Sequence, residues 1–100
     1  MSKYQIAKDA LEYMTKEMKN YYGREMGTVQ YRDGGVFISC IADGKMVSAY
    51  WHPDRKHSAT CLHGDKIVQR AVSDPGYPAI AYANCAMFGG NKCMYNDNVQ

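Results

Sequence analysis

The sequence lacks a long apolar run, an excess of charge of one sign and any motif of a known catalytic or cofactor site. Lys and Arg outnumber Asp and Glu by only 12 to 10, and they are scattered among the acidic residues. Such a balance does not favour nucleic-acid binding, which uses clustered basic residues. Lys3, Lys8 and Asp9 interrupt the start of the chain, and no stretch approaches the roughly 20 apolar residues that span a membrane. We therefore expect no export signal, no membrane partner and a cytoplasmic location.

The spacing of the cysteines also lacks a strong signal. The four cysteines are Cys40, Cys61, Cys85 and Cys93. In a reducing compartment we expect free thiols, which behave as small buried hydrophobic groups. Cys61 and His63 would share one face of a strand, but no C-x-x-C pair accompanies them. A zinc site at Cys61, His63, Cys85 and Cys93 is therefore only a weak alternative, and we expect no cofactor.

Size and composition indicate one folded domain. The chain has 100 residues, of which 46% are hydrophobic and 22% are charged. This is near the usual size of a single domain and supplies enough apolar mass for one core. We expect residues 1–100 to form this domain, with frayed ends at 1–2 and 96–100.

An amphipathic pattern predicts a helix over residues 3–22. Ser2 and Gln5 form a capping box at its start, and Gly23 supplies the left-handed residue that ends it. Apolar residues recur at alternating intervals of three and four, which is the period of a helix with one buried face. These residues are Ala7, Leu11, Met14, Met18 and Tyr21.

Two Asp-Gly steps predict a meander of three antiparallel strands. Asp33-Gly34 and Asp43-Gly44 each lie between strand-like runs, the strongest short-range signal of a two-residue hairpin. With these turns, Val29 opposes Ile38, Tyr31 opposes Val36, Cys40 opposes Val47, Ile38 opposes Ala49 and Val36 opposes Trp51. All of these side chains then share one face, which we expect to pack on the helix.

The rest of the chain carries weaker signals. Residues 58–63 are expected to form a short fourth strand. Asp65 fits a helix N-cap before an apolar run that ends at Val72, and Pro78 and Gly89 fit the two ends of a helix over residues 79–88. The predicted fold class is thus α+β: an N-terminal helix packed on a three- to four-stranded antiparallel meander, followed by one or two short C-terminal helices.

The second face of the predicted meander is the candidate functional surface. It carries several large apolar side chains, so either the C-terminal segment covers it or it binds a partner. On the second alternative, the candidate partner-binding residues are Arg32, Phe37, Ile41, Met46 and Tyr50. Without reaction machinery, we hypothesise a small regulator or inhibitor of a larger protein complex, such as a viral anti-CRISPR protein that a mobile genetic element directs against host defence. A homodimer through the same face is a further possibility.

Two alternatives come from other functional classes. A metal-dependent or cysteine-based module would centre on Cys61 and His63, because a cysteine nucleophile needs a nearby histidine. A weak RNA- or DNA-binding module is the other, since the order of elements is similar to that of double-stranded-RNA-binding domains. Only Lys66 and Arg70 stand where such a domain has a basic cluster.

Overall fold

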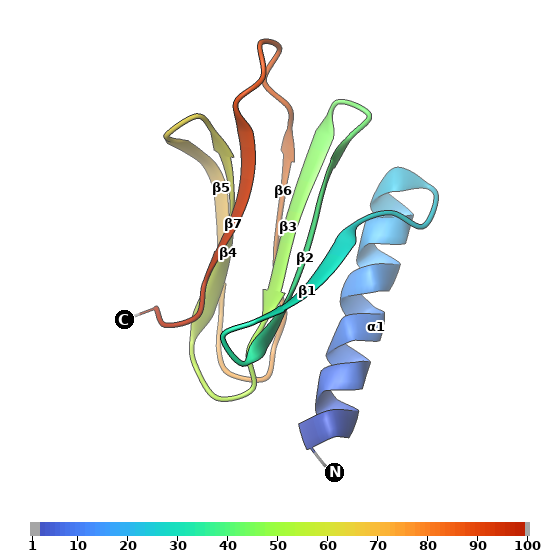
Figure 1. Ribbon diagram of the computed structural model, residues 1–100, viewed down its shortest axis with the longest axis vertical. Coiled ribbons are helices and arrows are strands. Elements are labelled where there is room, and N and C mark those ends of the chain that lie inside the picture. Colours follow the sequence, from blue (N-terminus) through green and yellow to red (C-terminus); the bar gives the residue numbers. More distant parts are fainter. Residues whose placement is uncertain (1–2, 100) are drawn as a thin grey trace.

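One helix and seven strands form the part of the chain that the structure describes. The computed structural model describes residues 3–99, and the side chains of residues 8–99 (Figure 1). The elements follow one another in the order α1 Lys3–Tyr22, β1 Thr28–Arg32, β2 Gly35–Ala42, β3 Lys45–Trp51, β4 His57–His63, β5 Lys66–Ser73, β6 Ala79–Asn84 and β7 Asn91–Asn96. No helix among these residues is long and apolar enough to cross a membrane.

The strands form two antiparallel sheets that pack face to face. The first sheet has the order β1-β2-β3-β6, and the second has the order β5-β4-β7. In Figure 1, α1 (blue) lies on the side of the first sheet that faces away from the second. The molecule is therefore a β-sandwich with one helix on its outer surface, and most of it is β-structure.

The predicted helix over residues 3–22 is confirmed. Ala10, Met14 and Met18 of α1 are buried against the first sheet. The helix ends at Gly23, which has a φ of 77° and whose N–H donates to the carbonyl of Lys19 at 2.7 Å. The capping box of Ser2 and Gln5 and the side chain of Ala7 lie outside the described residues.

Both Asp-Gly hairpins and their register are confirmed. Asp33 and Asp43 have φ values of 52° and 56°, and the glycines that follow them have values of 83° and 75°. Positive φ at both central residues is what a type I′ turn requires. All of the predicted pairs occur, from Val29 opposite Ile38 to Val36 opposite Trp51. On the β2 and β3 strands this face is buried under α1, through Val36, Ile38, Val47, Ala49 and Trp51.

The opposite face of the first sheet is covered by the second sheet. Phe37, Met46 and Tyr50 are at most 6% exposed. Tyr95 of β7 stacks on Tyr50 with ring centroids 4.4 Å apart. The premise of an exposed sheet face is therefore wrong for these three candidate residues, and the alternative that the C-terminal segment covers them is confirmed. Arg32 and Ile41 of the same predicted surface do remain exposed.

The two predicted C-terminal helices are wrong, whereas the fourth strand is confirmed as β4. Residues 66–73 and 79–84 form strands β5 and β6. Gly64-Asp65, interpreted above as a helix start, is the two-residue connection between β4 and β5, and Gly64 has a φ of 61° there. Gly-Asp between strand-like runs is itself a hairpin signal. The segments became strands because pairing with β4 and β3 satisfies their backbone groups along the whole run.

The end of the chain is bound to the loop before β4. Asn96 pairs with Ser58, and the N–H of Val99 donates to the carbonyl of Lys56 at 2.8 Å. Arg55 and Asp97 form an ion pair at 2.8 Å. These contacts hold residues 96–99 beside β4, while residues 1–2 and 100 lie outside the described part of the chain.

Removal of the Tyr50 side chain should strongly destabilise the protein. Tyr50 is fully buried, and its hydroxyl donates to the carbonyl of Arg32 at 2.9 Å. Tyr50→Ala should lower the free energy of unfolding by about 3–5 kcal/mol, because it opens a cavity between the sheets. Tyr31→Ala, at a side chain that is 70% exposed, is the matched control and should change it by less than about 0.5 kcal/mol. Urea denaturation measures both, and equal effects would contradict the covered face.

Alkaline pH should weaken the contact between α1 and β6. The Tyr82 hydroxyl donates to the Glu17 carboxylate at 3.3 Å, and burial together with that carboxylate raises the pKa of Tyr82 to about 12. The pKa of tyrosine in the unfolded chain is about 10, so the contribution of the Tyr82 hydroxyl to the free energy of unfolding is complete below about pH 10. This contribution is lost as the pH rises towards 12.

The melting temperature should therefore fall between pH 10 and 12, and Tyr82→Phe should make that fall shallower. Circular dichroism followed through thermal melts measures it. Tyr77→Phe, at a side chain that is 68% exposed, is the control and should keep the wild-type slope. Identical slopes for Tyr82→Phe and wild type would disprove the assignment.

Candidate functional site

The most exposed apolar side chains lie in the loop between β6 and β7. Met87 is 89% exposed and Phe88 is 96% exposed. We call Ala86, Met87 and Phe88 the apolar tip. In Figure 1 the loop that contains it projects beyond the other turns at its end of the sandwich. Both side chains are more exposed than Tyr31 and Tyr77, which are 70% and 68% exposed and carry a polar hydroxyl.

Backbone hydrogen bonds hold the apolar tip in place. The N–H of Ala86 donates to the side-chain oxygen of Asn91 at 2.7 Å. On either side, the N–H of Cys85 donates to Gly44 at 2.8 Å, and the N–H of Gly64 donates to Gly90 at 2.7 Å. The loop is thereby joined to the β2–β3 and β4–β5 turns. The tip is thus an ordered projection of the sandwich, which lowers the entropy that binding would cost.

The sequence interpretation missed the tip because it assigned residues 79–88 to a helix. A helix would have spread Met87 and Phe88 along a face that packs on the core. Gly89 and Gly90 have φ values of 86° and 77°, so they reverse the chain instead of capping a helix. The Gly-Gly pair is a turn signal, and it was the feature that could have located the loop.

Basic residues gather at the same end of the sandwich as the tip. Lys45 and Lys66 begin strands β3 and β5, and Lys92 is the second residue of β7. Lys66 and Lys92 are exposed. Asp43 in the neighbouring turn is paired with Arg24 at 2.8 Å, so its charge is balanced. With Asp65 in the β4–β5 turn also counted, this end of the sandwich keeps an excess of positive charge.

Three cysteines lie between the two sheets. Cys61 and Cys93 are register partners on β4 and β7, and Cys85 packs against the same small cluster of Met46 and Ala81. The Cys61 thiol donates to the carbonyl of Ala81 at 3.4 Å. The interaction with the neighbouring Cys93 thiol lowers the pKa of Cys61, and the same interaction together with burial raises the pKa of Cys93.

The cysteines and His63 do not converge on a metal site. His63 Nε2 lies 2.8 Å from the carbonyl of Asn84. Among the described side chains, residues 8–99, no three His, Cys, Asp or Glu residues approach closely enough to hold a metal ion. The hydrogen-bond partners of the Cys61 thiol are carbonyl oxygens and Cys93, not a histidine. The structure therefore does not bring together Cys61 and His63, the two residues on which the metal-dependent or cysteine-based alternative depends.

The other two histidines are structural. His52 Nδ1 accepts the N–H groups of Asp54 and Arg55, each at 3.1 Å, and Nε2 lies 3.0 Å from the carbonyl of Asp33. His57 Nδ1 and Nε2 lie 2.8 and 2.7 Å from the carbonyls of Arg55 and Tyr77. Both rings are buried. All four ring nitrogens face backbone groups, so neither histidine is available as a base or a ligand.

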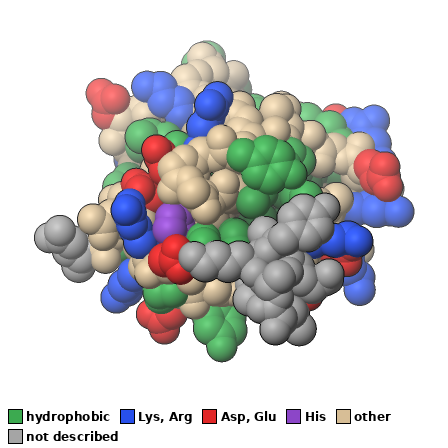
Figure 2. All heavy atoms as spheres, turned by 60° about the horizontal axis from the view of Figure 1, so that its bottom comes forward, with side chains coloured by type: hydrophobic (Ala, Val, Ile, Leu, Met, Phe, Trp, Pro, Cys, Tyr) green, Lys and Arg blue, Asp and Glu red, His purple; other side chains and the backbone are tan. Residues whose placement is uncertain are grey.

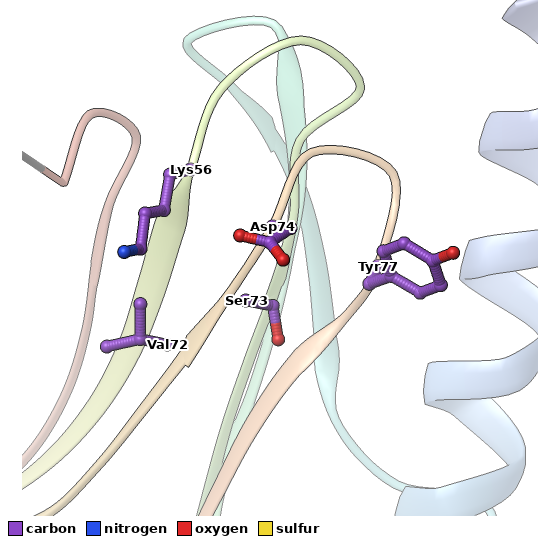
Figure 3. A pocket seen from close by; sticks show the side chains of 5 residues that line it. All are labelled: Lys56, Val72, Ser73, Asp74 and Tyr77. Atoms are coloured by element: carbon purple, nitrogen blue, oxygen red, sulfur yellow. The ribbon is translucent and has the colours of Figure 1, made fainter.

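The end of the sandwich opposite the tip has mixed surface chemistry. Figure 2 looks onto it, and basic, acidic and hydrophobic side chains are interspersed over the coloured part of that face. A shallow hollow of about 650 Å³ lies beside it (Figure 3). Lys56, Asp74 and Tyr77 line it, but in Figure 3 they spread over the surface and do not point to a common centre. The hollow does not hold a convergent set of catalytic groups.

The predicted partner-binding residues are dispersed. Phe37, Met46 and Tyr50 are inside the sandwich, whereas Ile41 is 47% exposed and Arg32 lies next to the β1–β2 turn. The five residues therefore form no common surface. A role for Arg32 or Ile41 in binding a partner stays a prediction.

Comparison with known proteins identifies a family. A family model described as Bacteriocin (Lactococcin_972) matches residues 33–95. The search of curated proteins found no match, and the search of solved structures found none either. The matched segment begins at the Asp33-Gly34 turn and ends in β7, so it contains β2 to β7.

This match corrects the functional interpretation of the sequence. A bacteriocin is a protein that bacteria release against other bacteria. The family therefore contradicts the hypothesis of an intracellular regulator or inhibitor, the viral and anti-CRISPR assignment, and the predicted cytoplasmic location. The scattered charge and missing motifs that supported those interpretations are equally compatible with a small antibacterial protein. Because the match spans almost two thirds of the 100 residues, the chain belongs to the Lactococcin_972 family of bacteriocins.

Proposed function

We propose that this protein is a secreted bacteriocin that acts on other bacteria from the outside. The observation that carries this proposal is the family match over residues 33–95. It contains six of the seven described strands, including every strand of the second sheet. The part that this chain has in common with the family is therefore the folded body of the sandwich, not an isolated loop or helix.

The body of the sandwich is stabilised by burial between its two sheets. Each of the two sheets buries one face against the other, with Tyr50, Tyr95 and Phe37 in mutual contact. Four antiparallel pairings link the strands of the matched segment. Apolar burial of this extent stabilises the fold without a bound metal or partner chain. Function is then carried by what the sandwich presents at its surface.

The apolar tip is the part of the surface that we propose contacts the target cell. Burial of a side chain such as Met87 or Phe88 contributes about 1.5–3 kcal/mol. Lys66 and Lys92 at the same end would add electrostatic attraction to anionic lipids. Because hydrogen bonds already order the loop, binding loses little conformational entropy, and most of the free energy of burial contributes to affinity.

The first test is growth inhibition by the purified protein. The folded protein, added to cultures of a panel of Gram-positive and Gram-negative bacteria, should inhibit growth of at least some strains. Heat-denatured protein is the control and should be inactive. An absence of inhibition across the panel at micromolar concentrations would contradict the bacteriocin assignment.

The second test separates the tip from the rest of the surface. Met87→Ser combined with Phe88→Ser should raise the inhibitory concentration at least about tenfold, because it removes the two exposed apolar groups. Its melting temperature should stay within about 2 °C of wild type, since neither side chain is buried. Tyr77→Ser, at an exposed aromatic residue in the β5–β6 loop, is the matched control. If the double variant is as potent as wild type, the proposal that the apolar tip contacts the target cell is wrong.

A further inference from the structure

Two cysteines face each other across neighbouring strands of the second sheet. Cys61 of β4 and Cys93 of β7 are direct register partners in an antiparallel pair. Residues in such positions have Cα atoms about 4.5–5.5 Å apart. This separation lies inside the range of about 4.4–6.8 Å that a disulfide bond requires. The backbone therefore already has the spacing of a cross-strand disulfide.

The two side chains also point in the same direction. The Cys61 thiol donates to Ala81 at 3.4 Å, and the Cys93 thiol donates to Val47 at 3.3 Å. Both acceptors belong to the first sheet, so both sulfur atoms lie in the space between the sheets. The two thiols also perturb each other, lowering the pKa of Cys61 and raising that of Cys93, as neighbouring thiols do.

The remaining cysteines are placed differently. Cys40 opposes Val47 and shares its face of the first sheet, which is packed under α1. It is therefore separated from Cys61 and Cys93 by the sheet itself. Cys85 follows β6 and packs near the pair, but it has no register partner among the cysteines. Geometry selects Cys61 and Cys93 from the possible combinations.

We propose that Cys61 and Cys93 form an intramolecular disulfide bond in the exported protein. The inference rests on the proposed function for its oxidising compartment, because disulfides persist outside the cytoplasm. The two thiols would lose two protons and two electrons to a disulfide oxidant, which would be reduced to two thiols while the new S–S bond forms. One thiolate attacks the oxidant to give a mixed disulfide, and the second thiol then displaces the remaining half of the oxidant as a free thiol.

The bond would fasten β7, the strand that follows the apolar tip, to the second sheet. β7 is an edge strand of the second sheet, and β4 is its central strand. The loop closed by the bond contains β5, β6 and residues 86–88 of the tip. A covalent link from β7 to β4 would thus hold the tip on the sandwich when the protein meets a lipid surface or a protease.

Thiol mapping tests the proposal directly. The full chain is incubated with oxidised glutathione, unfolded in guanidinium chloride and alkylated with N-ethylmaleimide. Two of the four cysteines should be alkylated, Cys40 and Cys85, and proteolysis should yield a peptide that joins Cys61 to Cys93. Alkylation of all four, or a bond that includes Cys85, would overturn it. Because the mapping requires no antibacterial activity, its outcome is independent of the growth-inhibition test.

A pair of variants measures the consequence for stability. Oxidation should raise the melting temperature of wild type and of Cys85→Ser by about 10 °C relative to the reduced protein. It should leave the melting temperature of Cys93→Ser unchanged. Equal oxidation shifts in the two variants would refute the pairing. If Cys93→Ser does not fold, the mapping of the wild-type chain still decides the question.

Discussion

The contact between the two sheets is the interaction on which the rest of the structure depends. Tyr50 is at its centre: its ring stacks on Tyr95 and meets the edge of His57 at 5.7 Å, and its hydroxyl donates to Arg32. Ser48, also fully buried, donates to the carbonyl of Met94 at 2.8 Å. The Ser48 hydrogen bond joins the two sheets, whereas the Tyr50 hydrogen bond lies within the first sheet, so apolar burial is combined with fixed hydrogen bonds at this contact. The position of one sheet on the other, and of every loop that they support, follows from this contact.

The same contact explains how much of the fold could be predicted. Local signals were sufficient for α1 and the β1–β3 meander, because a 3.6-residue apolar stripe and two Asp-Gly turns each specify one conformation. The register followed from the turns, and every predicted pair occurs. The covering of the second face depends on contacts with β4 and β7 of the second sheet, which no local signal joins to the meander. The exposure of Phe37 and Met46 could therefore be judged only with the second sheet in place.

The errors in the C-terminal half have a common physical cause. Ile67, Val68 and Val72 fit either a helix with one apolar side or a β-branched strand, and short runs of this kind are ambiguous. Strand pairing decided the outcome, because β5 and β7 supply both edges of β4. Because residues 79–88 were predicted to form a helix, the exposed loop that holds the apolar tip was not predicted. The pairing of Cys61 with Cys93 could not be predicted either, because no strand was expected at residues 91–96.

The two outer faces of the sandwich are covered to different degrees. The first sheet directs Val36, Ile38 and Trp51 outward, and α1 buries them. The outer side of the second sheet carries a shallow groove lined by residues that include Leu62, Ile67 and Met94, and Ile67 and Met94 are 55% and 51% exposed. An uncovered Trp51 would add a further large apolar surface to the first sheet. The helix precedes the segment matched by the family, yet it covers residues within that segment. In this chain the segment matched by the family model and the N-terminal helix therefore form one continuous structure, and the helix supplies a third layer over the first sheet.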